Sequence, residues 1–349
     1  MGCLCNCCRK KKKMNINKIS PLIEKTISNF KQIKVLGQGK YGKVFLVQET
    51  ESKKLYAMKR IKKPDITNIH LINQIKEEQK IFKQLNHPFI LKLYYSFQDN
   101  NNLYLITDFM QGGELKSLLS KSIQLKENKA KFYLSEILLA LEYMHKNNLI
   151  YRDLKPENIL IDEKGHIKLS DFGLSKILNE NNKTYTLCGT SYYKAPEINL
   201  GKGYDRMCDF WSFGIIMFEM ICGFKPFDIN NNKELIIDYD NLNIPFIDDI
   251  KYSSKDLIMK LLVVNPKERL GFNSVDDIKN HEFFKNVDFN KVLSKKEIPP
   301  FIPKIEHDLD LKYFNSKYTE MELHNFDTED FLNVNIDNNE FEGYSYSED

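Results

Sequence analysis

The pattern of apolar residues changes near residue 125, and this change limits the folds that the chain can adopt. Before it, short runs rich in β-branched and aromatic residues (30–49, 54–62 and 102–110) predict strands separated by turns. After it, apolar residues recur at helical spacing, first over 128–147 and then in two later segments, 209–222 and 254–264. We therefore predict an α+β fold in which a small β-rich lobe, about residues 30–108, precedes a larger helical lobe, about 114–284.

The charge distribution separates both ends from this body. The chain has 349 residues, 42% of them hydrophobic, which is enough for a sizeable core, and its net charge is +3. Residues 9–13 carry five consecutive cations, whereas residues 306–349 carry thirteen carboxylates against two lysines. The body has single, scattered cysteines and no apolar run follows Met1, so we expect a cytoplasmic protein without a transmembrane segment.

A glycine-rich segment lies between the first two predicted strands. GQGKYGKV, residues 37–44, fits the pattern G-x-G-x-x-G-x-V. A dinucleotide-binding turn needs a helix after the glycines, and here a strand follows. The pattern favours a flap whose backbone N–H groups cover phosphates, and a glycine-rich hairpin without a ligand is the alternative.

A glutamate interrupts the apolar stripe of the helix predicted between the third and later strands. Leu71, Ile75, Phe82 and Leu85 form the stripe, and Glu78 fills its open position. A buried carboxylate is costly unless it meets a cation, so Glu78 predicts a partner, and Lys59 on the preceding strand is the natural one. A purely structural ion pair would give the same pattern.

Three further motifs follow in order. YRDLKPEN contains Arg152, Asp153, Lys155 and Asn158; DFG begins eighteen residues after Asp153, at Asp171, and APE occupies 195–197. With the glycine-rich loop, Lys59 and Glu78, their order and spacing resemble those of eukaryotic protein kinases over residues 30–284. The resemblance implies a bilobal kinase fold that uses ATP and Mg²⁺ to phosphorylate proteins.

The resemblance assigns roles to individual residues. Asp153 would accept the proton of the substrate hydroxyl, Lys155 would steady the γ-phosphate, and the Lys59–Glu78 pair would hold the other phosphates. Asn158 and Asp171 would bind two Mg²⁺ ions, which suits their hard oxygen donors. Thr107 would be the gatekeeper beside adenine. The implied ATP contacts are Gly37, Gln38, Gly39, Lys40, Gly42, Val44, Ala57, Lys59, Thr107, Asp108, Met110 and Glu114.

Motifs outside the catalytic core are similar to those of the AGC group, which includes protein kinases A, B and C. TLCGTSYYKAPE, NPKERLG, HEFFK, PPFIPK and the closing FEGYSY carry this resemblance. It implies that residues 285–349 form a tail that wraps back over the small lobe and docks aromatic residues, Phe341, Tyr344 and Tyr346, beside the Glu78 helix. Phe314 lies in the tail segment expected to approach ATP. Phosphorylation of Ser345 would strengthen the docking, and simple disorder of an acidic tail is the alternative.

The same resemblance places a regulatory phosphosite at Thr186. A phosphate there could pair with Arg152 and Lys176 and order the surrounding loop. Three structural contacts are also implied: Thr190 with Asp153 and Lys155, Glu197 with Arg269, and Asp209 with the catalytic loop.

Substrate preference rests on a few positions. Glu114, Glu157 and Glu219 match family positions that contact arginines upstream of the acceptor, and Leu187 is a further expected substrate contact. Ser191 and Lys194 depart from the Pro and Leu of the familiar relatives, so no large apolar residue is assumed after the acceptor. Tyr151 replaces the commoner histidine, and the tail has no Ser-Pro or Thr-Pro for a turn-motif phosphosite.

The first residues, MGCLCNCCRKKKK, allow three interpretations. The cysteines are too crowded for an ordinary zinc site, and idle thiols at a chain end are the second possibility. We favour lipidation, with myristate on Gly2 and palmitate on Cys3, Cys5, Cys7 and Cys8, followed by cations that face anionic lipid. Asn6 departs from the usual Ser or Thr of a myristoylation signal.

Residues 1–29 are thus predicted to form an anchor segment and linker. They would place the protein on the inner face of the plasma membrane or of endomembranes. The expected partners are protein substrates, an upstream activating kinase and the membrane, with no nucleic acid. A membrane-tethered scaffold without catalytic activity is the alternative, and it predicts damage at Lys59, Asp153, Asn158 or Asp171, all of which are intact.

Overall fold

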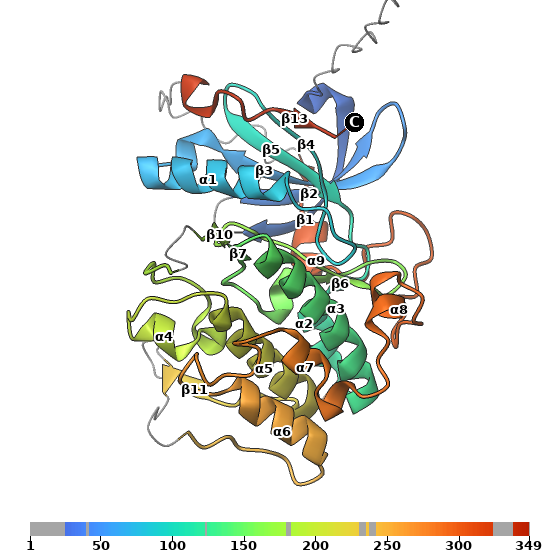
Figure 1. The fold of residues 1–349 in the computed structure, drawn as a ribbon. Coiled ribbons are helices and arrows are strands. Elements are labelled where there is room, and N and C mark those ends of the chain that lie inside the picture. The colour runs from blue at the N-terminus through green and yellow to red at the C-terminus, as the bar shows by residue number, and fades with distance from the viewer. Residues whose placement is uncertain are drawn as a thin grey trace, which may run out of the picture.

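The computed structural model describes residues 25–39, 42–122, 124–178, 183–229, 235–236, 242–323 and 338–348. A six-stranded antiparallel sheet and one long helix form the smaller lobe, and most of the helices lie in the larger lobe below it (Figure 1). This arrangement confirms the predicted α+β fold. The segment 1–24, with Gly2 and its cysteines, and Lys40 of the glycine-rich loop lie outside the described residues.

The sheet of the small lobe has the order β1-β2-β3-β5-β4-β13. The strands predicted over 30–49, 54–62 and 102–110 are confirmed as β1 to β3 and β5, whereas the sequence analysis missed β4 and the tail strand β13. The six strands are β1 (Phe30–Gly39), β2 (Gly42–Glu49), β3 (Leu55–Lys62), β4 (Leu93–Gln98), β5 (Asn102–Asp108) and β13 (Tyr346–Ser347).

Shorter strands belong to three small sheets below the large one. They are β6 (Gly113–Glu114), β8 (Ile159–Ile161) and β9 (Ile167–Leu169) in the first, β7 (Leu149–Ile150) and β10 (Lys176–Ile177) in the second, and β11 (Asp228–Ile229) and β12 (Leu235–Ile236) in the third. The segment between β7 and β8 carries YRDLKPEN, so the strands hold both ends of this motif.

The helices of the described residues are α1 (Ile69–Phe82), α2 (Leu115–Lys121), α3 (Glu127–Lys146), α4 (Pro196–Asn199), α5 (Met207–Cys222), α6 (Tyr252–Leu261), α7 (Asp276–Lys279), α8 (Phe289–Leu293) and α9 (Ser316–Thr319). The four predicted helical segments are confirmed as α1, α3, α5 and α6, and the five shorter helices were not predicted. Asn68 caps α1 by accepting the Leu71 N–H, and Gly223, at φ +84°, ends α5 in the left-handed conformation that favours glycine. None of the described helices is both long and apolar enough to cross a bilayer.

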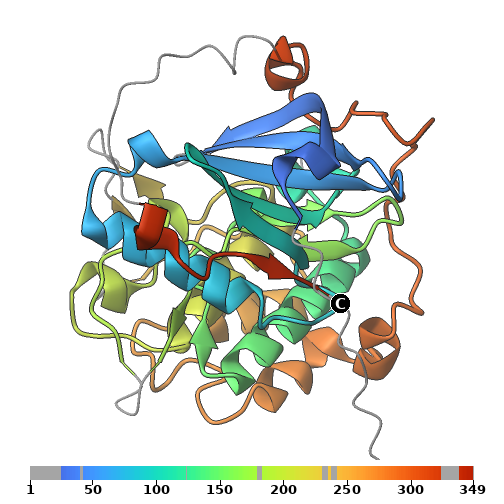
Figure 2. The same ribbon diagram turned by 90° about the horizontal axis from the view of Figure 1, so that it is seen from above.

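Two apolar cores result. The larger one fills the helical lobe around α3 and α5 and continues upward to α1, where it includes Phe341 and Tyr344 of the tail. The smaller one lies on the other side of the small-lobe sheet, and Tyr318 and Met321 of the tail pack against it. The chain after residue 300 therefore contacts both sides of the small lobe, and its last strand runs beside β4 and above α1 (Figure 2).

Candidate active site

Helix α1 and strand β3 bring Lys59 and Glu78 together, as predicted. The Lys59 Nζ lies 2.7 Å from the Glu78 Oε1 and 3.8 Å from the Asp171 Oδ1. Only 7% of Glu78 is exposed. Burial raises the pKa of Glu78 and the Lys59 ammonium lowers it, burial being the larger effect. Lys59 thus links the carboxylate of α1 to the carboxylate of the DFG motif.

Asp153 lies at the centre of a hydrogen-bond network in the segment between β7 and β8. Its Oδ2 accepts bonds from the Lys155 Nζ at 2.6 Å and the Asn158 Nδ2 at 2.9 Å. Its Oδ1 accepts a bond of 2.8 Å from the Thr190 hydroxyl, which in turn accepts one of 3.0 Å from Lys155. The predicted contacts of Thr190 are confirmed. The network fixes the orientation of the carboxylate and shows that an alcohol can donate to it.

The backbone before Asp153 is held by a buried carboxylate. Asp209 of α5 accepts the N–H groups of Tyr151 and Arg152 at 3.0 and 2.8 Å, and its Oδ2 lies 2.8 Å from the His145 Nε2. Arg152 and Asp171 both have positive φ, +69° and +53°, which costs about 1–3 kcal/mol for each residue that is not glycine. The Asp209 contacts stabilise one of these two strained positions and confirm its predicted bracing role.

The DFG motif packs inward. The Phe172 ring is buried 5.0 Å from the Phe82 ring of α1 and 5.6 Å from the Tyr151 ring. The Tyr151 hydroxyl donates to the Ser170 carbonyl, so the tyrosine that replaces the commoner histidine ties the catalytic segment to the residue before DFG. Gln74 of α1 donates to the Gly173 carbonyl at 2.6 Å. These contacts keep α1 and DFG in register, although the sequence analysis did not identify Gln74.

The donor set beside Asp153 fits a magnesium ion. The Asn158 amide nitrogen donates to the Asp153 carbonyl and carboxylate, which fixes the plane of the amide and therefore the direction of its oxygen. The side chain of Asp171 is half exposed. Among the described residues no three His, Cys, Asp or Glu side chains form a metal cage, and Mg²⁺ commonly takes one or two protein oxygens together with phosphates and water.

The nucleotide-binding residues predicted on the sheet lie on adjacent strands. Ala57 of β3 pairs with Thr107 of β5, whose hydroxyl donates to the Ala57 carbonyl at 3.4 Å. The Asp108 carboxylate already accepts bonds from Lys168 at 2.6 Å and from the Lys92 N–H at 2.9 Å, so its backbone is what remains for a ligand. A Cβ on Gly42 would lie 2.2 Å from the Arg60 carbonyl, which excludes any other residue there.

Three glutamates gather near the catalytic segment. Glu114 precedes α2, Glu157 lies in the short 3₁₀ helix Pro156–Asn158, and Glu219 lies on α5. Burial and then Glu157 raise the pKa of Glu114, whereas burial raises the pKa of Glu219, which also accepts the Tyr193 hydroxyl at 2.7 Å. Leu187 is 68% exposed, so it is open to a partner.

The two expected cations, Arg152 and Lys176, lie near the segment that carries Thr186. The Tyr204 hydroxyl donates to the Thr186 carbonyl at 2.6 Å and accepts a bond of 3.2 Å from Arg152, while Lys176 donates to the Thr184 hydroxyl at 3.2 Å. Thr186 itself is exposed. Both cations therefore bond close neighbours of Thr186, and their pairing with a phosphate stays a prediction.

The predicted ion pair between Glu197 and Arg269 is confirmed. Arg269 is fully buried, and its two terminal nitrogens lie 2.8 and 2.9 Å from the two carboxylate oxygens. This bidentate geometry fixes the end of the segment that carries Thr186.

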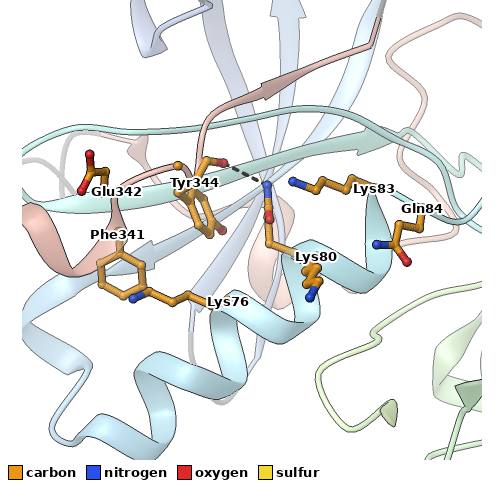
Figure 3. Close-up of a pocket in the computed structure, with 9 residues that line it drawn as sticks. Lys76, Lys80, Lys83, Gln84, Phe341, Glu342 and Tyr344 are labelled. Atoms are coloured by element: carbon orange, nitrogen blue, oxygen red, sulfur yellow. Dashed lines mark hydrogen bonds between the residues drawn. The ribbon is translucent and has the colours of Figure 1, made fainter. Parts of the chain in front are cut away.

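The tail docks against α1, as predicted. Phe341 and Tyr344 are buried there, and Figure 3 shows both rings facing the helix, with the bond from Gln79 to the Tyr344 carbonyl drawn as a dashed line. That carbonyl accepts bonds from the Gln79 Nε2 at 3.0 Å and from the Ser96 hydroxyl at 2.7 Å. Ser345 is exposed. A cavity of about 270 Å³ lies between tail residues 341–344 and the lysines of α1, Lys76 and Lys80.

Two further tail contacts escaped the sequence analysis. Gln98 donates to the Phe341 carbonyl at 2.9 Å, and Gln111 donates to the carbonyls of His307 and Asp310, each at 3.0 Å. The Phe314 ring stacks on the ring of Phe109, with 5.8 Å between their centroids, and Phe109 lies in the segment between β5 and α2. This position agrees with the expectation that the Phe314 segment approaches the nucleotide region. The available signal for Gln98 and Gln111 was that each polar residue follows a run of mostly apolar and aromatic residues.

Comparison with known proteins agrees with this geometry. The family model for the protein kinase domain matches residues 30–284. The chain is 42% identical over 306 residues to the serine/threonine-protein kinase gad8 of Schizosaccharomyces pombe, covering 87% of this chain and 53% of gad8. It is 43% identical over 298 residues to the ribosomal protein S6 kinase alpha-3 of Homo sapiens, covering 84% and 40%. It is 40% identical over 299 residues to the cAMP-dependent protein kinase catalytic subunit of Dictyostelium discoideum, covering 85% and 46%.

The chain spans about half the length, or less, of these relatives. The match with the family model nevertheless covers more than half of this chain and includes every motif of the site. The chain belongs to the protein kinase family and, within it, to the AGC group.

Proposed function

We propose that the chain is a protein kinase that transfers the γ-phosphoryl group of ATP to serine or threonine in protein substrates. The network around Asp153 carries this proposal, because its carboxylate accepts a hydroxyl while a fixed lysine and asparagine stand beside it. The intact Lys59–Glu78 pair supports it as well. No observation favours the alternative of a membrane-tethered kinase-like scaffold without activity.

In the proposed reaction, the substrate hydroxyl oxygen bonds to the γ-phosphorus of ATP, and the bond from that phosphorus to the bridging oxygen of ADP breaks. The hydroxyl proton passes to the Asp153 carboxylate. Lys155 and Lys59 stabilise phosphate charge, and Thr190 holds Asp153 until the substrate hydroxyl replaces it. Asn158 and Asp171 would hold Mg²⁺, which supplies neutralising charge to the phosphates when bound.

An acceptor series tests this proposal. The full chain, phosphorylated on Thr186, would be given ATP, Mg²⁺ and basic peptides that differ only in a Ser, Thr, Tyr or Ala acceptor. We expect phosphate on the Ser and Thr peptides alone, located by mass spectrometry, and loss of transfer in Asp171→Asn. Transfer to none of the peptides, or equal transfer by Asp171→Asn, would refute the assignment.

The three glutamates, Glu114, Glu157 and Glu219, support substrates with basic residues before the acceptor. Each carboxylate can accept charge-assisted hydrogen bonds from lysine or arginine, and burial of Glu219 strengthens such bonds. The relatives named as ribosomal S6 and cAMP-dependent kinases are matched over this region, but their substrates are not transferred to this chain.

Phosphorylation of Thr186 and Ser345 by an upstream kinase is the proposed regulation. A phosphate on Thr186 would lie near Arg152 and Lys176, and one on Ser345 would extend from the exposed end of the docked tail. Both would favour the arrangement in which α1 presents Glu78 to Lys59.

Membrane anchoring through residues 1–29 rests on the sequence, since the lipidation residues lie outside the described part. Gly2, the nearby cysteines and the five cations support a peripheral position on a cytoplasmic membrane face. Labelled myristate and palmitate would be fed to cells expressing the chain, with Gly2→Ala and Cys→Ser variants as controls. Incorporation of neither lipid by the wild type would reject the anchor.

A further inference from the structure

A lysine of the chain itself lies among the three glutamates. Lys116, on α2, is 2.8 Å from the Glu157 Oε1, and its side chain is more than half exposed. Glu114 and Glu219 also raise the pKa of Lys116, after the hydrogen bond to Glu157, so all three carboxylates act on this ammonium. Lys155 also acts on Glu114, and Lys225 on Glu219, through space, whereas Lys116 is hydrogen-bonded to its glutamate.

Lys116 occupies the accessible side of Glu157. The other carboxylate oxygen, Oε2, is buried and has no hydrogen-bond partner in the described part of the chain. The ion pair with Lys116 lowers the pKa of Glu157 even though burial alone would raise it. An incoming basic side chain must therefore displace Lys116 from the Glu157 Oε1 or share that oxygen with its positive charge, because the other oxygen is enclosed.

We infer that Lys116 is a specificity-determining residue that fills the Glu157 subsite in place of a basic side chain of the substrate. This inference rests on the proposed kinase function and deepens it. Displacement exchanges one charge-assisted bond for another, and sharing places two cations side by side, so an arginine directed at Glu157 adds little to substrate affinity. Glu114 and Glu219, for which the structure gives no ion pair within the described residues, retain their attraction for cations. The chain then selects for fewer upstream basic residues than three glutamates suggest.

The ion pair could instead serve only the stability of α2. The two roles differ in what they change, because a stabilising pair would affect all peptides equally. The decisive quantity is the ratio of kcat/KM between an arginine and an alanine at each upstream position of the peptide. This ratio is taken within one variant and is therefore independent of how active that variant is.

The experiment uses the full chain and one basic peptide in which each upstream residue is arginine or alanine in turn. We expect one position at which arginine raises the kcat/KM of the wild type less than about threefold over alanine. In Lys116→Gln the gain at that position should rise to the order of tenfold, because the carboxylate is released. In the double variant Lys116→Gln, Glu157→Gln the gain should disappear, and Lys126→Gln, which removes an exposed lysine elsewhere, should match the wild type.

Two results would overturn the inference: ratios that are the same in Lys116→Gln and the wild type, or a gain that persists in the double variant. Calorimetry with peptides that carry alanine as acceptor gives the corresponding ratios of dissociation constants, which need no catalysis. Failure of phosphoryl transfer would thus reject the proposed function while the binding ratios still decide the role of Lys116.

Discussion

The docked tail contains a polar group that weakens it. The Tyr344 ring is buried against α1, and its hydroxyl is buried without a hydrogen-bond partner in the described residues. An unsatisfied buried hydroxyl costs about 1–3 kcal/mol. The change Tyr344→Phe removes this group and leaves the bonds that Gln79 and Ser96 donate to the backbone carbonyl. We therefore expect tighter docking, with the undocked state about 5 to 150 times less populated.

Hydrogen exchange of the tail measures this change. The Glu348 N–H donates to the Tyr94 carbonyl at 2.9 Å only when β13 lies beside β4, so exchange in segment 342–348 reports undocking. Exchange should slow in Tyr344→Phe and accelerate in Phe341→Ala, since truncation of a buried phenylalanine costs about 3–5 kcal/mol. The variant Tyr252→Phe, at a largely exposed tyrosine, is the control and should behave as the wild type.

Unchanged or faster exchange in Tyr344→Phe would refute this reasoning, because it would mean that the hydroxyl contributes to docking. Docking of the tail should also affect the Lys59–Glu78 pair. Gln79, which binds the tail, follows Glu78 directly on α1. A tail that docks more tightly should hold Glu78 against Lys59 for a larger fraction of the time.

Three further predictions concern stability and activation. Glu197→Gln should destabilise the fold by about 3–5 kcal/mol in denaturant unfolding, because it leaves Arg269 buried without its carboxylate, while Glu282→Gln at an exposed pair should have little effect. Burial lowers the pKa of His87 from 6.5 to about 4, so the unfolded chain binds more protons than the folded chain between these two pH values. The free energy of unfolding should therefore fall by up to about 3 kcal/mol as the pH drops through this window. It should fall by less in His87→Gln. Phosphorylation of Thr186 should raise kcat on the order of tenfold, and an equal kcat for the phosphorylated protein and Thr186→Ala would contradict the proposed pairing with Arg152 and Lys176.

The sequence predicted the Lys59–Glu78 ion pair because a charge in apolar surroundings needs a partner. Glu78 interrupts a regular apolar stripe, so a cationic partner was expected with Lys59 as the natural candidate, and the structure confirms this pair. The positions of Asp153, Asn158 and Asp171 followed from motif spacing, and their mutual contacts could not be derived from spacing alone. The strands over 30–49, 54–62 and 102–110 were predicted from their β-branched and aromatic residues, but β4 was missed although LYYSFQ has the same kind of composition.

Contacts between distant parts of the chain were the hardest to predict. Gln79 and Tyr344 are 265 residues apart, and a side chain that bonds a backbone carbonyl at such a separation leaves no periodic signal. The ion pair of Lys116 and Glu157 has the same character, since each residue alone resembles an ordinary charge at a helix or turn. The resemblance to a family supplies the positions of single residues, whereas these contacts depend on how distant segments pack against one another.

The most direct test of the account replaces Asp153 with asparagine, which keeps the shape of the side chain but removes the base. The turnover of a basic serine peptide and the dissociation constant of ATP would be measured with Mg²⁺ for the wild type and for Asp153→Asn, both phosphorylated on Thr186. We predict that kcat falls about 10²- to 10⁴-fold while ATP affinity stays the same. A kcat within a few fold of the wild type would contradict the assignment of Asp153 and, with it, the proposed kinase mechanism.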